Sequence, residues 1–237
     1  MILHNNLSFA IYFGDSEDCC VKPFYKDSIK SFSDLQKKLN LEKLVFLKQT
    51  HSSDGLCIND DIAKTQGTLS IFEKMGDYII TNQRNIGIGV VTADCLPLIL
   101  YDPVKHISAV IHAGWKGAID NIAIKAFNLM QEKFDCKITD IFCYLGPCAK
   151  VCCYKVSEDF KANLEFTNFS EEVFLKKGED VFFDLVRFVK LQLLDLGIKC
   201  ERIKEEYNAC TICNHKFYSY RRQGVLAGRQ ATIIVLK

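Results

Sequence analysis

The stretch VVTADCLPLILYDPVKHISAVIHAGWKGAIDN, residues 90–121, decides the fold of this chain. Three apolar runs meet in it or directly before it, at residues 85–93, 96–102 and 106–113. Each run is apolar at successive positions, which is typical of central strands that are covered on both faces. Cys95 separates the first two runs, and His112 lies at the end of the third, before a glycine-containing turn. Both residues are therefore candidate nucleophiles or metal ligands.

The rest of the chain mixes short apolar runs with helical patterns. We expect further strands at residues 8–14, 44–50, 77–82, 140–147 and 231–236. We expect helices at residues 33–39, 119–134, 158–166 and 184–196, the first starting from a capping box at Ser33, and an internal loop near 167–180. No repeat or linker interrupts this pattern. The sequence therefore predicts one α+β domain, residues 1–237, with mixed central β-sheets covered by helices.

The composition argues against several kinds of partner. Apolar residues make up 49% of the 237 residues, which allows a large core, and the formal net charge is only +1. Because there is no basic excess, we expect no nucleic-acid partner. Because no apolar run is long enough to span a bilayer and the first residues lack a signal-peptide pattern, we expect no membrane association and a cytoplasmic location. We also expect a monomer.

A third candidate ligand follows another predicted strand. His51 comes directly after residues 44–50, far from Cys95 and His112 in the sequence, so the spacing is not that of a zinc finger. Two imidazoles and a thiolate suit Zn²⁺, and three protein ligands leave a fourth position for water or substrate. Such an ion can activate water near neutral pH. From spacing alone, the alternative is a surface histidine, a buried thiol and a core histidine.

Several blocks of the chain resemble the laccase-domain family, once called multicopper polyphenol oxidases. These blocks are VVTADCLPLILYDP (90–103), HAGWKG (112–117), LGPCAKVCCYKV (145–156), FYSYRRQG (217–224) and GRQA (228–231). The resemblance starts at KQTH (48–51) and covers most of the chain. It implies a fold similar to that of bacterial toxin-like Cys-His hydrolases. It also implies a metal site, with zinc as the expected ion, on His51, Cys95 and His112.

The resemblance also implies an activity. Members of this family are described as purine nucleoside enzymes, which carry out phosphorolysis of adenosine, inosine, guanosine or methylthioadenosine, and deamination of adenosine. The expected partners are therefore a purine nucleoside and phosphate. Bacterial relatives have also been linked to peptidoglycan editing.

Other residues are candidates for contacts in such a reaction. Lys116 and Arg222 are candidate phosphate contacts, since Lys116 lies where a glycine turn enters a helix whose N-terminus attracts anions. Asp94 is a candidate general base or histidine-orienting group, or else it caps a turn. Gln49 shares a strand face with His51 and either binds substrate or pairs with backbone. Trp115 either stacks on a purine or packs in the core.

The remaining cysteines form a second pattern. The chain has 12 cysteines, and the adjacent pairs Cys19-Cys20 and Cys152-Cys153 close disulfides only with strain, so reduced thiols are expected. Cys210 and Cys213 form a CxxC motif, followed by His215, that is half of a zinc-site pattern. Cys148 and Cys152 are candidate further ligands of a second metal.

Three other functions stay open at this point. A metal-free cysteine hydrolase or amidase, acting for example on a peptidoglycan precursor, would use Cys95 as nucleophile and His112 as base. A copper-dependent polyphenol oxidase would need many histidines, whereas the chain has five, although copper can bind such a site in vitro. A non-enzymatic role in a complex explains none of the motif residues.

Overall fold

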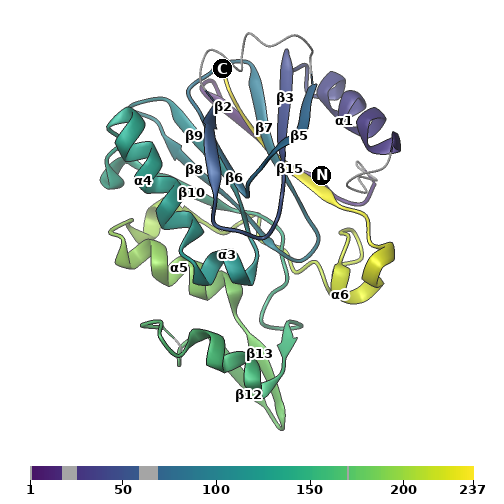
Figure 1. The fold of residues 1–237 in the computed structure, drawn as a ribbon, viewed down its shortest axis with the longest axis vertical. Helices are drawn as coiled ribbons and strands as arrows, with labels where there is room; N and C mark the ends of the chain where they lie inside the picture. The colour runs from purple at the N-terminus through teal and green to yellow at the C-terminus, as the bar shows by residue number, and fades with distance from the viewer. Residues whose placement is uncertain (1, 18–25, 59–68, 170) are drawn as a thin grey trace.

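The computed structural model describes residues 2–17, 26–58, 69–169 and 171–237 (Figure 1). Two six-stranded sheets and one three-stranded sheet are combined with helices, which confirms the predicted α+β class. The pair Cys19-Cys20 lies outside the described residues.

The first large sheet has the strand order β1-β2-β15-β7-β3-β5. Its strands are β1 (Ile2–Asn5), β2 (Phe9–Phe13), β15 (Gln230–Leu236), β7 (Ile86–Thr92), β3 (Lys43–Lys48) and β5 (Leu69–Met75). Strand β3 is parallel to β7, whereas β15 is antiparallel to it. The C-terminal ends of β3 and β7 and the N-terminal end of β15 therefore lie at the same end of this sheet.

The second large sheet has the order β14-β10-β8-β9-β6-β4. Its strands are β14 (Ile203–Lys204), β10 (Phe142–Leu145), β8 (Leu96–Asp102), β9 (Ile107–Ala113), β6 (Tyr78–Thr81) and β4 (Gly55–Ile58). Strands β8 and β9 form an antiparallel hairpin in which Pro97 is paired with His112. The start of β8 and the end of β9 consequently lie side by side.

Alternation along the strands explains why both large sheets are apolar on both faces. On β8, Ile99 belongs to a core shared by the two sheets, whereas Leu98 and Leu100 pack in a second core with the helices. Successive strand residues point to opposite faces, so a strand buried on both sides needs an unbroken apolar run. The prediction from residues 96–102 and 106–113 is confirmed.

Helices cover the outer faces of the two sheets (Figure 1). Helices α3 (Trp115–Ile119), α4 (Ile122–Phe134) and α5 (Leu185–Asp195) pack on the second sheet, and α1 (Lys26–Lys38) packs on the first through Phe32 and Leu35. The described part of the chain holds no helix with the length and apolar character that crossing a membrane requires.

Some local predictions were wrong. The helix predicted from Ser33 starts at Lys26, so Ser33 lies inside α1 and does not cap it. The helix predicted at 119–134 is two helices, because Asn121 takes a left-handed conformation with φ 59° between them. Residues 158–164 form a 3-10 helix, η2 (Glu158–Leu164), and not an α-helix. By contrast, the helix predicted at 184–196 is α5, and Asp184 caps it by accepting a hydrogen bond from the Arg187 N–H.

The predicted loop near 167–180 was also partly wrong, because it contains a strand. The third sheet consists of β11 (Lys155–Val156), β13 (Asp180–Phe183) and β12 (Phe174–Lys177), and β12 and β13 lie far from the N-terminal strands in Figure 1. The short segments that complete the chain are η1 (Ile138–Asp140), η3 (Cys200–Arg202), α6 (Tyr220–Gln223) and η4 (Gly224–Leu226).

Candidate metal centre

Strand ends from both large sheets gather the three predicted ligands in one place. His51 follows β3, Cys95 lies in the turn between β7 and β8, and His112 is on β9. One ligand atom from each of the three residues lies within 4.8 Å of the others. The two imidazole rings meet edge to face, with their centroids 4.8 Å apart. This cluster can therefore hold a metal ion.

A buried carboxylate, Asp77, holds this cluster in place. It is fully buried at the start of β6, and its Oδ1 accepts a 2.7 Å hydrogen bond from Nδ1 of His112. The same carboxylate accepts hydrogen bonds from the backbone N–H groups of Thr50, His51 and Ser52 and from the hydroxyls of Thr50 and Ser52. With Nδ1 engaged, His112 presents Nε2 to the cluster, which is how a carboxylate orients a metal-binding histidine.

In this network, a charge on Asp77, Cys95 or His112 favours the ionised form of its neighbour. Burial raises the pKa of the Asp77 carboxyl, but the hydrogen bond and charge of His112, with hydrogen bonds from Ser52, lower it to about 2. Burial raises the pKa of the Cys95 thiol, but the charge and hydrogen bond of His112 and a hydrogen bond from His51 lower it to about 6. Burial lowers the pKa of His112, but the charge of Cys95 and the contact with Asp77 raise it to about 9. The surroundings of Cys95 therefore favour the thiolate, which is the form that binds a metal.

The backbone around the cluster is specialised. His51 and Asp94 are non-glycine residues with positive φ values of 60° and 86°. Such conformations are sparsely populated and tend to occur at functional sites. A Cβ on Gly114 would lie 3.1 Å from the Cys95 sulfur and 3.2 Å from Cδ2 of His51, so a side chain there would crowd both ligands.

The donor set fits a divalent metal ion of intermediate softness. It consists of two imidazole nitrogens and one thiolate, with a carboxylate behind one of the imidazoles. Three protein ligands are characteristic of catalytic zinc sites, because the fourth position stays open for water or substrate. His51 is exposed and Cys95 is half-buried, so such an open position faces the solvent side of the cluster.

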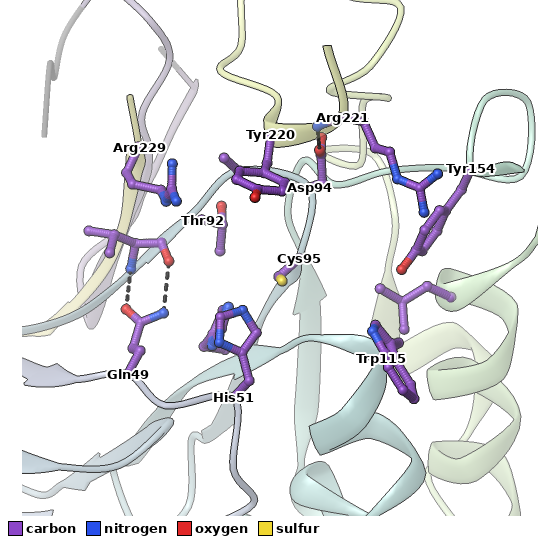
Figure 2. A pocket seen from close by; sticks show the side chains of 14 residues that line it. Gln49, His51, Thr92, Asp94, Cys95, Trp115, Tyr154, Tyr220, Arg221 and Arg229 are labelled. Atoms are coloured by element: carbon purple, nitrogen blue, oxygen red, sulfur yellow. Dashed lines mark hydrogen bonds between the residues drawn. The ribbon is translucent and has the colours of Figure 1, made fainter. Parts of the chain in front are cut away.

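A cavity of about 590 Å³ opens above the three ligands. Its volume lies within the range of about 300–1,000 Å³ that is usual for small-molecule sites. Besides the ligands, the cavity is lined by three aromatic residues, Trp115, Tyr154 and Tyr220, and by two arginines, Arg221 and Arg229. Figure 2 shows the Cys95 sulfur near His51, with Arg221 and Tyr154 on one side of the pocket and Arg229 on the other.

Two other predicted site residues line the cavity and also bind backbone or loop groups. Gln49 makes a pair of 2.8 Å hydrogen bonds with the N–H and C=O of Val91 (Figure 2). The Asp94 carboxylate accepts hydrogen bonds from the hydroxyls of Thr211 and Ser219 and from the N–H of Arg221. The carboxylate that contacts a histidine is therefore Asp77. The roles of Gln49 in substrate binding and of Asp94 as general base stay predictions.

The two predicted phosphate contacts lie elsewhere. Lys116 is exposed, with its ammonium 5.5 Å from the ring centroid of Trp115, and it is not among the residues that line the cavity. The guanidinium of Arg222 donates hydrogen bonds to the carbonyls of Thr211, Ile212 and Phe217, and Arg222 does not line the cavity either. Phosphate binding by Lys116 and Arg222 stays a prediction, and their contacts in this structure are with the protein itself.

Sequence reasoning missed four residues that matter for the pocket. Asp77 carried a signal, because an acidic residue directly before the apolar run YIIT indicates a buried, partnered carboxylate. Tyr154, Tyr220 and Arg229 lie within the quoted family blocks, but nothing in their spacing shows that they share a cavity. Only the meeting of strand ends and loops from distant parts of the chain reveals it.

Comparisons with known proteins agree with this geometry. A family described as multi-copper polyphenol oxidoreductase laccase matches residues 26–237. A purine nucleoside phosphorylase of Clostridium acetobutylicum is 34% identical over 215 residues, which cover 89% of this chain and 83% of that protein. The human purine nucleoside phosphorylase LACC1 is 30% identical over 203 residues, or 84% of this chain but only 44% of the human protein.

A solved structure shows the same fold. The crystal structure of hypothetical protein YfiH from Bacillus licheniformis has a TM-score of 0.83 and 23% sequence identity, and the match covers 97% of this chain and 93% of that one. The fold and the site together define an α+β protein with a preformed His-Cys-His centre at the base of a cavity. The chain belongs to the multi-copper polyphenol oxidoreductase laccase family, as its sequence blocks indicated.

Proposed function

We propose that this protein is a zinc-dependent purine nucleoside enzyme and that phosphorolysis is its main reaction. The observation that carries the proposal is the convergence of His51, Cys95 and His112 beneath a cavity with aromatic walls and two arginines. The names of the relatives, purine nucleoside phosphorylases that are 34% and 30% identical, support the substrate class.

The residues that line the cavity suit both expected reactants, the purine nucleoside and phosphate. Trp115, Tyr154 and Tyr220 offer flat surfaces on which a purine can stack. Arg221 and Arg229 offer positive charge to phosphate, and planar guanidinium groups bind phosphate oxygens in pairs. Burial lowers the pKa of Arg229, although the nearby charges of Cys95 and Asp94 oppose that effect, so a bound anion would offset its desolvation.

In phosphorolysis, a phosphate oxygen attacks C1′ of the ribose and the bond from C1′ to the base nitrogen breaks. The electron pair of that bond leaves with the base, which takes up the proton that the attacking hydrogen phosphate gives up, and the products are ribose 1-phosphate and the free base. The arginines hold the attacking anion, and the aromatic residues fix the base relative to it. His51, Cys95 and His112 would hold a divalent ion, which when bound would supply Lewis-acid chemistry to the reaction.

We propose zinc rather than copper because too few histidines are available for a multicopper site. The chain has five histidines, and only His51 and His112 belong to the cluster. His4 instead contacts the hydroxyl of Tyr207, and His106 contacts that of Tyr101. Because Cu²⁺ binds such sites more tightly than Zn²⁺ in vitro, metal content should be measured on protein that has never been exposed to added copper.

Deamination of adenosine and a metal-free hydrolase are the competing activities. Deamination needs a water activated at the same open position, as the donor set allows. The hydrolase is favoured by one observation, the closeness of the Cys95 thiol to a histidine, His112, that Asp77 orients, because such a pair activates a cysteine nucleophile. His51 discriminates, since a metal site needs it and a cysteine-histidine pair does not.

The decisive experiment separates products. Zinc-loaded and chelator-stripped protein are each incubated with adenosine or inosine, with and without phosphate. We expect free base only with zinc and phosphate together. Inosine formed from adenosine without phosphate would instead indicate deamination, and turnover by stripped protein would contradict the proposal.

Two variants complete the test. His51→Ala should lose both zinc and phosphorolysis, whereas a cysteine hydrolase would keep its activity in this variant. Cys57→Ala removes a half-buried thiol outside the cavity and serves as the control, which should keep full activity.

A further inference from the structure

A second cluster of metal-ligating side chains lies outside the cavity. It consists of Cys152, Cys153, Cys210 and Cys213, and one sulfur from each lies within 4.8 Å of the others. None of the four lines the cavity. All four are free thiols, as is every cysteine in the part of the chain that the structure describes. The proposed function uses none of them.

We propose that Cys152, Cys153, Cys210 and Cys213 bind one zinc ion in a structural site that is separate from the His51-Cys95-His112 centre. This site differs in composition from the one that the CxxC motif suggested, because His215 and Cys148 do not belong to the cluster. The adjacent pair Cys152-Cys153 supplies the other two ligands.

The distances fit tetrahedral coordination. Sulfurs bound to zinc at about 2.3 Å lie about 3.8 Å apart, and the sulfurs here are at most 4.8 Å apart, so small side-chain rotations complete the site. A disulfide needs a separation of about 2.05 Å and a specific geometry, which adjacent cysteines reach only with strain. Four thiolates around one ion leave no open position, and such closed sites are structural.

The backbone holds the two cysteine-bearing loops together without the ion. Cys148 and Cys210 form a parallel β-bridge, in which the Thr211 N–H donates to the Cys148 carbonyl at 2.9 Å and the Cys148 N–H donates to the Ala209 carbonyl at 3.0 Å. Arg222 then ties the CxxC loop down through the carbonyls of Thr211 and Ile212. The four sulfurs therefore meet on a prearranged framework.

Backbone N–H groups also point at a sulfur, as they do in metal-thiolate sites. The backbone of Cys213, Lys150 and Ile212 donates hydrogen bonds to the Cys210 sulfur. Amide hydrogen bonds of this kind stabilise the thiolate that a metal requires. Cys152 and Cys213 are exposed, so an ion can reach the cluster from solvent.

The location of the cluster gives such an ion a role. Tyr154, which lines the cavity, directly follows Cys153, and Thr211, which hydrogen-bonds Asp94, directly follows Cys210. An ion that joins these two loops would fix one wall of the cavity. Its contribution is to stability, because binding to the folded chain alone stabilises it.

Metal stoichiometry tests the proposal. The full chain is produced in zinc-supplemented medium and purified without oxygen, and zinc is counted per chain by elemental analysis. We expect two equivalents in the wild type and one in Cys95→Ala. We also expect one in the double variant Cys152→Ser and Cys213→Ser, whose changed residues are exposed and therefore spare the core. Cys200→Ser alters an exposed thiol outside both clusters and should keep two equivalents.

A spectroscopic measurement makes the result independent of activity. Cobalt loaded into Cys95→Ala should show the intense sulfur-to-metal absorption of a four-thiolate site, and the double variant should lose that absorption. Chelation should lower the thermal midpoint of Cys95→Ala, and it should leave unchanged the midpoint of the triple variant that combines Cys95→Ala with Cys152→Ser and Cys213→Ser. A single equivalent in the wild type that is lost in Cys95→Ala, a second equivalent that survives in the double variant, or disulfides among these cysteines in freshly purified protein would overturn the proposal.

Discussion

The two cysteine-containing clusters of this molecule are built in opposite ways. The His51-Cys95-His112 centre has three ligands from strand ends of two stacked sheets, an oriented histidine and a cavity above it. The four-cysteine cluster has ligands from two surface loops and no cavity of its own among those described. Three mixed ligands leave room for a reactant, whereas four thiolates enclose an ion. We therefore propose that the same residue type serves reactivity in one region and stability in the other.

The largest effect that separates the two regions is expected in catalysis. Cys95→Ala should lower kcat for phosphorolysis at least about 10³-fold, because it removes the thiolate ligand of the reactive centre. Cys152→Ser should change kcat by less than about threefold, since Cys152 lies outside the cavity. Steady-state assays with inosine and phosphate measure both values. Equal losses in the two variants would break the distinction between a reactive and a structural cluster.

Asp77 provides a sharper test of how the first centre is supported. Asp77→Asn should weaken zinc binding at that centre about 10- to 100-fold, because the hydrogen bond that orients His112 loses its charge. Competition with a zinc-binding dye measures the affinity, and the second equivalent should be unaffected. Asp54→Asn, an exposed neutralisation at the residue whose backbone carbonyl accepts a hydrogen bond from the Asp77 N–H, is the matched control. Unchanged affinity in Asp77→Asn would show that Asp77 serves the fold alone.

The low pKa of Asp77 also predicts a dependence of stability on pH. Its pKa is lowered from 3.8 to about 2 in the folded chain, so the folded state favours the ionised form. This contribution, about 2 kcal/mol, is fully present above pH about 4 and is lost as the pH falls towards 2.

Urea unfolding of metal-free wild type and Asp77→Asn across this range measures the contribution. The difference in free energy of unfolding should shrink as the pH falls from about 4 to 2. A difference that stays constant would contradict the assigned pKa.

Arg221 and Arg222 are neighbours in the sequence, but one belongs to the cavity and the other to the region of the four-cysteine cluster. Arg221 lines the cavity, so Arg221→Gln should raise KM for phosphate roughly 10-fold with little change in the thermal midpoint. Arg222 ties the loop of the four-cysteine cluster, so Arg222→Gln should lower the free energy of unfolding by about 1–3 kcal/mol and leave KM for phosphate unchanged. Phosphate titrations and thermal melts on both variants test this. A raised KM in Arg222→Gln would favour the contact that the sequence predicted.

Much of the fold could be predicted because apolar runs and strand periodicity are local properties. The runs at 96–102 and 106–113 match β8 and β9 closely, since a doubly covered strand needs apolar residues at every position. The helix predicted at Ser33 failed because a capping-box spacing also occurs inside helices, and the third sheet was missed because its strands are short and partly exposed.

Of the candidate site, the residues with unusual chemistry could be predicted and their neighbours could not. His51, Cys95 and His112 stood out because reactive side chains followed apolar strands, and the resemblance to a family grouped them. The charges of Lys116 and Arg222 within the motifs predict phosphate contacts, and these stay predictions because a formal charge does not reveal which way a side chain points. Arg229 lies in the cavity for a topological reason, because β15 begins beside the end of β7.

The sequence by itself determined the α+β class, the positions of the central strands and the residue types that can bind a metal, because these depend on local patterns of polarity and chemistry. Only the tertiary structure decided which carboxylate supports His112, which cations face the cavity, and that Cys152 and Cys153 join Cys210 and Cys213. The physical reason is that such sites form where separate strand ends and loops meet, and that meeting depends on how the sheets pair and pack.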